Sequence, residues 1–233
     1  MTDVQVSVII PTFRRPRLLV SAVESVLRQE LQDLEVLIVE DGSGTDLSTI
    51  AKNFDDERIR LVALNHHSGN PGYVRNQALK LTKSSWVAFL DSDDQWLQTH
   101  LSRGLTWLEE SGEQFLSQAS VPRDSELTQS PKALAPRAIG VRELLNQNSI
   151  VTSGVVCHRE LLEQADLFPA AAGIYEDWGL WLRMSQLTQL FQSAVPTIEY
   201  RQQPDSLSHQ LDPIATRYRT LIDFLDWLDQ RGR

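Results

Sequence analysis

The sequence predicts an α/β fold in which a mostly parallel sheet carries helices on both faces. Apolar runs rich in β-branched residues alternate with helical patterns through the first hundred residues. Polar residues follow the ends of these runs. With 233 residues and 41% apolar content, the chain can bury a full core in one domain.

The first half contains four expected strands separated by helical segments. Strands are expected over 4–10, 34–39, 59–64 and 86–90. The first of them is dense in β-branched residues and ends at Pro11. Helices are expected from Pro16 onward, over 46–54, and over 70–81 after a turn.

The second half shows a weaker pattern. Residues 113–137 lose periodicity and contain three prolines, which predicts a long loop or an irregular pair of strands. Order resumes over 141–145, followed by an apolar run over 151–157 and helices over 159–165 and 176–187. A final amphipathic helix is expected over 213–229. The apolar face expected to pack on the body is Ile214, Tyr218, Leu221, Ile222, Leu225 and Leu228.

Composition excludes several classes of protein. The net charge of −9 disfavours nucleic-acid binding and docking on anionic lipid, because both need a basic surface. The single cysteine, Cys157, lies among apolar residues and is expected in the core, without a disulfide. No apolar run approaches the ~20 residues that span a bilayer, and the first residues do not resemble a signal peptide. A cytoplasmic protein is expected.

Polar side chains gather where the predicted strands end. Thr12 follows the first strand, Asp41 the second, and Asp91 and Asp93 the fourth. In parallel α/β sheets, ligands bind outside the carboxyl ends of the strands. This placement is the one that a nucleotide site requires.

The run Asp91-Ser92-Asp93-Asp94 crowds three carboxylates into four residues. Like charges repel, so this cluster favours a bound counterion. Mg²⁺ and Mn²⁺ fit, because both prefer oxygen ligands and usually share carboxylates with substrate phosphates. The alternative is a solvated turn before a helix that begins near Leu97.

Two further residues have both a functional and a structural interpretation. Asp41 is placed to accept the imide N–H of a uracil, or simply forms an Asp-Gly turn. Arg75 pairs with a phosphate or base, with Asp91 or Asp93 in the resting protein, or is a surface arginine.

A second acidic pair, Glu176 and Asp177, opens a predicted helix far along the chain. Asp177 is a candidate general base that takes a proton from an acceptor hydroxyl. Acidic residues in a first helical turn are also favoured by the helix dipole alone. Trp96 and Trp178 are either platforms for a sugar ring or core residues.

Other chemistries find little support in the sequence. His66 and His67 suggest a pair of metal ligands, but they lie in a polar loop, where histidines are usually solvated. The sequence has no Gly-x-Ser-x-Gly elbow, no Walker A loop, no Gly-x-Gly-x-x-Gly and no Cys-x-x-Cys.

Five stretches, taken together and in order, resemble the family 2 glycosyltransferases: SVIIPTFR, VEDGS, RN, FLDSDD and YEDWGLW. The resemblance covers the chain from Val4 to about Ser208. It implies one GT-A domain over 1–233 that performs an inverting transfer from a nucleotide-sugar to a hydroxyl. In this interpretation residues 1–112 form the nucleotide-sugar half, 113–211 the acceptor-binding and catalytic half, and 212–233 a C-terminal helix. The segment 113–137 is then a flap or acceptor wall.

The resemblance also implies a nucleotide pocket built from Pro11, Thr12, Phe13, Asp41, Arg75, Asp91 and Ser92. Phe13 would lie against the base, and Arg75 would help to hold the nucleotide. Asp41 would read the base, which favours UDP.

The remaining motif positions carry the chemistry that the resemblance implies. Asp91 and Asp93 would be the DxD pair, with Asp93 the more direct ligand of Mn²⁺ or Mg²⁺. Asp177 matches the catalytic base. The expected acceptor contacts are Trp96, Glu176 and Trp178.

The sequence departs from the common family pattern at three positions. Glu40 stands where the family often has Asp, and Gly179 replaces a frequent acidic residue after the base. Gln203 stands where a histidine near the diphosphate is common, which leaves open whether Gln203 or His209 contributes there.

The expected partners are a nucleotide-sugar donor and a glycan, lipid-linked or small-molecule acceptor, with peripheral membrane contact left open. One alternative is a non-catalytic nucleotide-sugar-binding subunit, although such a protein has no need of Asp177. Another is a nucleotidyltransferase, although those enzymes usually carry a glycine-rich basic loop after the first strand. Here that loop reads PTFRRP.

Overall fold

The computed structural model describes residues 4–44, 47, 53–122, 135–171, 175–200 and 212–232. The helix predicted over 46–54 lies largely outside these residues, and Gln203 and His209 lie outside them entirely. The four predicted strands are confirmed as β1 (Val6–Thr12), β2 (Leu34–Glu40), β3 (Ile59–Ala63) and β4 (Trp86–Phe89). They are parallel, with β1 between β2 and β4 and β3 outside β2.

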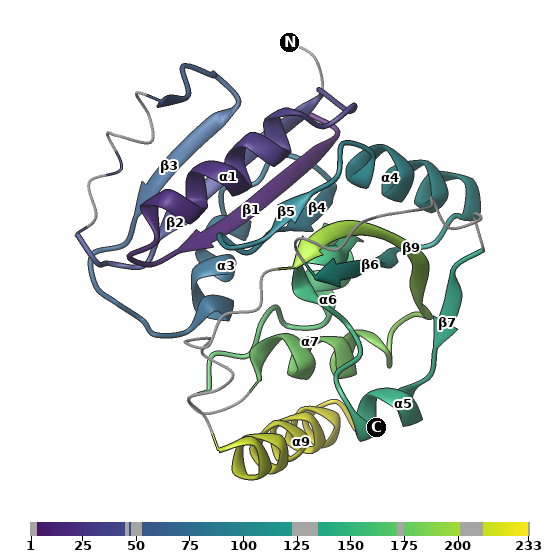
Figure 1. Cartoon of the computed structure of the whole chain (residues 1–233). Helices are drawn as coiled ribbons and strands as arrows, with labels where there is room; N and C mark the ends of the chain where they lie inside the picture. The colour runs from purple at the N-terminus through teal and green to yellow at the C-terminus, as the bar shows by residue number, and fades with distance from the viewer. Residues whose placement is uncertain are drawn as a thin grey trace.

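Past β4 the sheet continues with antiparallel pairings, except that β6 and β9 are parallel. The described strands form one nine-stranded sheet in the order β3-β2-β1-β4-β8-β6-β9-β5, with β7 paired to β9. The added strands are β5 (Gln95–Trp96), β6 (Phe115–Pro122), β7 (Arg137–Ile139), β8 (Val155–His158) and β9 (Leu190–Tyr200). The parallel strands β1–β4 therefore form one half, and the mixed strands form the other (Figure 1).

Helices cover both faces of the sheet, as predicted. The core on one face includes residues of α1 (Pro16–Leu27) and α4 (His100–Ser111). The core on the other face includes residues of α3 (Pro71–Leu79), α5 (Val141–Asn146), α6 (Arg159–Gln164), α7 (Glu176–Met184) and α9 (Pro213–Gln230). Cys157 is buried in β8, as predicted.

The segment predicted as a loop or an irregular strand pair has strands at both ends, but they do not pair with each other. β6 pairs with β8 and β9, and β7 pairs with β9. The apolar pattern of the sequence did not predict β6, because two of its buried residues, Ser117 and Gln118, are polar. Gln118 is satisfied by donating to the His100 carbonyl at 2.9 Å.

The final helix was predicted correctly in extent, but its buried face was not. The side chains of α9 that are buried are Thr216, Thr220, Phe224 and Trp227. Most of the predicted apolar face is instead exposed: Ile214, Tyr218, Ile222 and Leu225. A search for apolar periodicity counts threonine as polar, yet Thr220 Oγ1 faces the body and accepts a hydrogen bond from the Tyr175 N–H at 3.0 Å.

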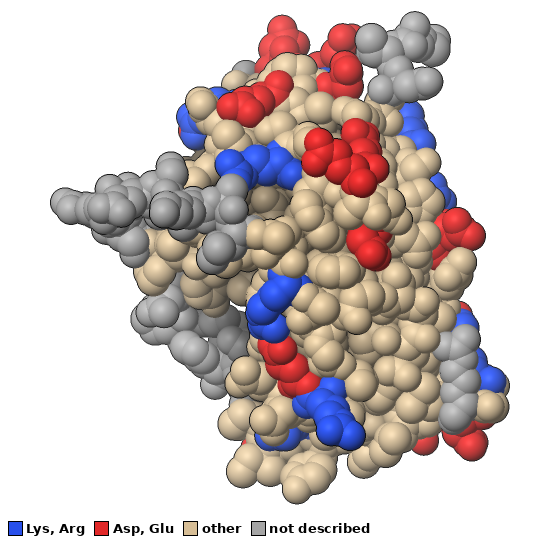
Figure 2. Space-filling model, turned by 90° about the vertical axis from the view of Figure 1, so that its right-hand side faces the viewer, with Lys and Arg blue, Asp and Glu red and all other residues tan. Residues whose placement is uncertain are grey.

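The charged side chains on the face shown in Figure 2 lie in small groups of either sign, separated by uncharged surface. None of the described helices combines the length and the apolar character needed to cross a bilayer.

Candidate functional site

The polar residues at the strand ends meet along one edge of the parallel half of the sheet. Thr12 of β1 lies opposite Glu40 of β2, and Asp41 follows directly. β4 pairs with the other side of β1 and leads through Leu90 to Asp91. The sequence therefore predicted this juxtaposition correctly, because it follows from parallel pairing alone.

Asp41 is bound to the loop that follows β3. Its carboxylate accepts backbone N–H groups from Ser68 at 2.8 Å and Gly69 at 3.1 Å. The next residue, Gly42, has φ +64° and lies so close to this loop that a Cβ would come within 2.1 Å of the His66 carbonyl carbon. The loop after β2 and the loop after β3 are therefore in close contact beside the end of β2.

An imidazole lies against both residues that were predicted to bind the base. The His67 ring stacks on Phe13 with centroids 3.8 Å apart and an interplanar angle of 12°. His67 Nδ1 is 2.8 Å from Asp41 Oδ2. The Arg14 guanidinium lies 5.0 Å from the centroid of the Phe13 ring. His67 is therefore more than the solvated loop residue that the sequence suggested.

Arg75 joins the edge of the sheet to the start of α7. Its side chain is 4% exposed, which excludes the surface alternative. One guanidinium nitrogen is 2.5 Å from Asp91 Oδ1, and another is 3.3 Å from Glu176 Oε1. Its buried Nε has no hydrogen-bond partner among the described residues. Of the alternatives that the sequence left open for Arg75, the structure therefore has the ion pair with Asp91.

The acidic loop after β4 contacts an arginine of the loop that follows β1. Asp93 Oδ2 is 2.5 Å from Arg15 Nη1. Burial and the nearby Asp91 charge raise the pKa of Asp93, against the lowering effect of Arg15. Burial, followed by the charges of Asp94, Asp93 and Asp91, raises the pKa of Tyr200 at the end of β9.

Within the described residues, no three His, Cys, Asp or Glu side chains form a complete metal site. Asp91 and Asp93 nevertheless offer two repelling carboxylates, of which Asp91 is 37% exposed. This donor set fits Mg²⁺ or Mn²⁺ that completes its coordination with substrate phosphates and water, rather than an ion caged by protein alone.

A short 3₁₀ turn, η1 (Thr152–Gly154), supports both groups of acids. Ser153 Oγ accepts the Asp91 N–H at 3.1 Å and donates to Asp94 Oδ2 at 2.6 Å. Thr152 Oγ1 donates to Asp177 Oδ2 at 3.1 Å. Two successive residues of one turn therefore hold the acidic loop and Asp177.

Asp177 lies in the first turn of α7 and has three neutral hydrogen-bond donors. They are Thr152, the Asn148 side-chain amide at 3.1 Å and the Trp178 N–H at 2.7 Å. Two of them lie outside α7, so capping of the helix does not account for the placement of this carboxylate. Burial raises the pKa of Asp177, against the effect of these hydrogen bonds and of Arg75.

Glu176 lies in a confined space beside Asp177. Burial and the Asp177 charge raise the pKa of Glu176 to about 7, against the lowering effect of Arg75. At the start of α3, a Cβ on Gly72 would lie 2.5 Å from Glu176 Cγ. Glycine there allows α3 and α7 to approach closely enough for Arg75 to reach Glu176.

The two predicted sugar platforms are core residues instead. The Trp96 indole N–H donates to the Ser153 carbonyl at 2.7 Å, and its ring stacks on His100. The Trp178 indole N–H donates to the Leu144 carbonyl at 2.7 Å. Both side chains are buried, so neither offers a free face to a sugar.

The other predicted nucleotide residues lie at the expected edge. Pro11, Thr12 and Ser92 are buried, and Phe13 is partly exposed. Sequence reasoning missed the supporting residues Arg15, Asn148, Thr152, Ser153 and Tyr200. Arg15 could have been predicted, because it directly follows the motif at the end of the first strand. The other four lie far along the chain from the residues that they contact, so only the tertiary fold reveals them.

Comparisons with known proteins show the family of the chain. A family model described as glycosyl transferase family 2 matches residues 7–164. The Escherichia coli UDP-Glc:alpha-D-GlcNAc-diphosphoundecaprenol beta-1,3-glucosyltransferase WfaP is 30% identical over 179 residues, which cover 77% of this chain and 69% of the relative. The putative teichuronic acid biosynthesis glycosyltransferase TuaG of Bacillus subtilis is 33% identical over 171 residues, covering 70% and 65%.

Solved structures share the fold at low sequence identity. S. aureus TarS 1-349 in complex with UDP-GlcNAc gives a TM-score of 0.73 at 20% identity, covering 87% of this chain and 60% of that chain. The mannosyltransferase PcManGT from Pyrobaculum calidifontis, in complex with GDP-Man and Mn²⁺, gives 0.69 at 19% identity, covering 98% and 65%. The family match extends over more than half of the chain, and the parallel strands β1–β4 are those predicted. The chain therefore belongs to glycosyl transferase family 2 and is a glycosyltransferase with the GT-A fold.

Proposed function

We propose that this enzyme transfers a sugar from a UDP-sugar to a hydroxyl acceptor with inversion, using a divalent ion and Asp177 as the general base. The observation that carries the proposal is the pair of contacts made by Arg75. It touches Asp91 at the sheet edge and Glu176 beside Asp177. Donor-side acids and a base candidate therefore lie on either side of one buried guanidinium.

The preference for UDP rests on Asp41 and Phe13. A carboxylate can accept the N3–H of uracil, which cytosine lacks, and an aromatic face can stack on the base. Both groups lie at the carboxyl end of the parallel strands, where nucleotides bind in such folds. TarS forms a complex with UDP-GlcNAc and PcManGT with GDP-Man, so nucleotide choice varies within the fold.

Asp91 and Asp93 are the proposed ligands of the divalent ion. A bound Mg²⁺ or Mn²⁺ would stabilise the negative charge of the departing nucleoside diphosphate. In this structure Asp93 is paired with Arg15, and Asp91 is paired with Arg75. Both arginines can exchange these carboxylates for diphosphate oxygens, because a guanidinium binds either group through paired hydrogen bonds.

Asp177 is the proposed acceptor of the proton from the attacking hydroxyl. Its donors from outside α7, Asn148 and Thr152, hold the carboxylate in a fixed orientation. Burial raises the pKa of Asp177, which makes its carboxylate a stronger base than that of an ordinary aspartate. Direct attack by the hydroxyl displaces the diphosphate from the opposite face, which inverts the anomeric carbon.

The acceptor class is proposed from the relatives. The name of WfaP specifies a diphosphoundecaprenol-linked acceptor, and that of TuaG specifies teichuronic acid biosynthesis. We therefore propose lipid-linked or polymeric glycan acceptors, bound by the half of the domain over 113–211, with 1–112 as the nucleotide-sugar half.

Ligand-dependent thermal stability and donor hydrolysis test the proposal together. UDP with Mn²⁺ should raise the melting temperature more than either alone, since a ligand that binds only the native state stabilises it. Slow hydrolysis of a UDP-sugar should be lost in Asp177→Asn while UDP binding persists. Equal stabilisation by UDP with and without Mn²⁺ would refute the metal role. Retained hydrolysis in the variant would refute the role of Asp177.

A further inference from the structure

The outer side of α9 carries a row of exposed apolar side chains. Ile214 is 68% exposed, Tyr218 64%, Ile222 55% and Leu225 59%. Their spacing of four, four and three residues places them along one side of the helix. They are four of the six exposed large hydrophobic residues described, and we call them the α9 stripe.

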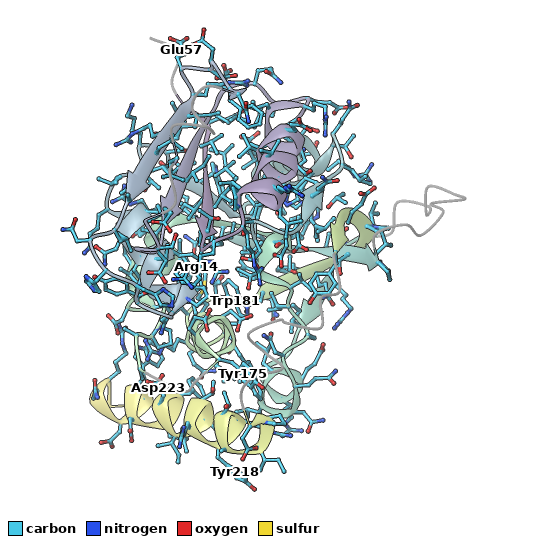
Figure 3. All side chains as sticks on the ribbon, turned by 60° about the vertical axis from the view of Figure 1, so that its left-hand side comes forward. Arg14, Glu57, Tyr175, Trp181, Tyr218 and Asp223 are labelled. Carbon is cyan, nitrogen blue, oxygen red and sulfur yellow. The ribbon has the colours of Figure 1, made fainter. Side chains whose placement is uncertain are left out.

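The α9 stripe is not needed to hold the helix in place. The opposite side of α9 packs on α7 through Thr220 and Trp227, among others. Asp223 reaches α7 and pairs with Arg183 at 2.7 Å. Figure 3 shows Tyr218 directed away from the body, with Asp223 on the side of α9 that faces α7. A contiguous exposed apolar row of this kind is typical of an interaction surface.

The charges beside the stripe are divided between the two ends of α9. Arg217 and Arg219 are exposed in the N-terminal half, and Asp226 and Asp229 are exposed in the C-terminal half. Within the described part of the chain, Arg219, Asp226 and Asp229 form no ion pair at up to 4.0 Å. A helix that lies on an anionic membrane usually has a basic polar face, which these aspartates and the net charge of −9 oppose.

We propose that the α9 stripe binds a second copy of this chain, with the two α9 helices antiparallel. Arg219 and Asp226 are seven residues apart, so they lie on the same flank two turns from each other. An antiparallel pairing brings Arg219 against Asp226 of the partner subunit, and the reverse contact forms by symmetry. Opposed helix dipoles favour the same orientation.

The size of the surface sets the strength of the dimer. A stable interface buries roughly 800 Å² on each partner, which is more than one helix side provides. The dimer is therefore weak and forms with rising concentration. Because the stripe faces away from the body, the substitutions below leave the fold intact.

Sedimentation velocity of the full chain, from about 5 to about 200 μM, tests the proposal. The wild type should shift from monomer toward dimer, and Ile222→Asp should remain monomeric with an unchanged melting temperature. Leu81→Asp, at an exposed apolar residue outside the stripe, is the matched control and should behave like the wild type. A wild type that stays monomeric, or an Ile222→Asp variant that still dimerises, would overturn the proposal.

Charge exchange tests the orientation. Arg219→Asp and Asp226→Arg should each weaken the dimer by about three- to tenfold, because each places like charges opposite one another. The double variant should restore the wild-type dimer, and failure to do so would overturn the antiparallel arrangement. Binding of a monomeric wild type to phosphatidylglycerol vesicles, lost in Ile222→Asp, would assign the stripe to lipid instead and overturn the proposal.

A separate observation supports an inference about donor binding, which rests on the proposed function. We infer that His67 occupies the place of the nucleoside base. Its flat ring stacks on Phe13 and its Nδ1 meets Asp41 Oδ2, which are the two contacts proposed for uracil. A base that binds Asp41 through this oxygen must therefore displace His67.

Calorimetric titration with UDP and Mn²⁺ tests this inference. His67→Ala should bind UDP about three- to tenfold more tightly than the wild type, because no stacked ring has to leave. His66→Ala is the matched control, since the His66 ring lies 6.3 Å from that of Tyr73. Equal or weaker binding by His67→Ala, with normal wild-type binding, overturns this inference alone. Absence of UDP binding in both proteins overturns the proposed donor and this inference with it.

Discussion

Two groups of carboxylates in this enzyme are held in different ways. At the sheet edge, Asp91 and Asp93 contact Arg75 and Arg15 at 2.5 Å. At the start of α7, the hydrogen bonds that Asp177 accepts from described residues all come from neutral donors. Charged partners can be exchanged for a metal and phosphates, whereas neutral donors fix a carboxylate in place and leave it free to accept a proton. The predictions below test this division between the two groups.

The largest effect is expected from Asp177→Asn, which keeps the shape of the side chain but removes its basicity. Turnover should fall by about 10²- to 10⁴-fold, the usual contribution of a general base. UDP affinity should stay within about twofold, because no donor-side contact changes. Steady-state kinetics and calorimetry measure the two quantities. A matching loss of UDP affinity would show that the two groups of acids do not act separately.

Asp93→Asn tests the donor side in the same way. It should abolish most of the extra thermal stabilisation that Mn²⁺ gives in the presence of UDP, and lower turnover by at least about tenfold. Asp177→Asn serves as the matched control and should retain the Mn²⁺ effect. If both variants lose the Mn²⁺ effect equally, the proposed division is wrong.

The pH dependence of kcat/KM should show the raised pKa of the α7 acids. Activity should rise with pH as Asp177 loses its proton, since only the carboxylate can accept one. The Asp177 charge in turn raises the pKa of Glu176 to about 7, so Glu176 ionises after Asp177 and is still protonated while Asp177 loses its proton. Glu176→Gln, which keeps this side chain neutral, should therefore leave the acidic limb in place. A limb that moves to lower pH in this variant would contradict the order in which the two acids ionise.

Thr152→Val should give the smallest effect. It removes one of the three donors to Asp177, a hydrogen bond worth about 1 kcal/mol, and should lower turnover by about fivefold. The acidic limb should move to higher pH, because the lost bond favours the charged form. Thr152→Ser keeps the hydroxyl and should restore both values. An unchanged pH profile in Thr152→Val would show that Thr152 does not position Asp177.

The sequence was informative where local pattern and topology decide the structure. The runs of β-branched residues predicted the parallel strands β1–β4. Because parallel strands end at the same edge of a sheet, they also predicted that the polar residues after these strands lie together. β6 was obscured by buried polar side chains, and the buried side of α9 by its threonines. Gln118 and Thr220 are buried with tertiary hydrogen bonds, which no periodicity reveals.

The residues of the candidate site also differ in how far the sequence could predict them. Asp41, Arg75, Asp91, Asp93 and Asp177 were predicted from motif and resemblance, and their roles stay predictions. The contact of His67 with Phe13 required the loops after β1 and β3 to meet. For Trp96 and Trp178 the structure has the core alternative. The sequence left this open, because an aromatic residue beside an acidic motif looks the same whether it faces solvent or core.

The η1 turn constrains how this enzyme can be recombined with its relatives. Ser153 and Thr152 lie on the C-terminal side of residue 112, yet Ser153 binds the loop that carries Asp91. In a chimera that joins residues 1–112 of a relative to the rest of this chain, the foreign acidic loop would contact an η1 turn from a different enzyme. Exchange of donor specificity should therefore require that η1 be transferred together with the acidic loop that it supports.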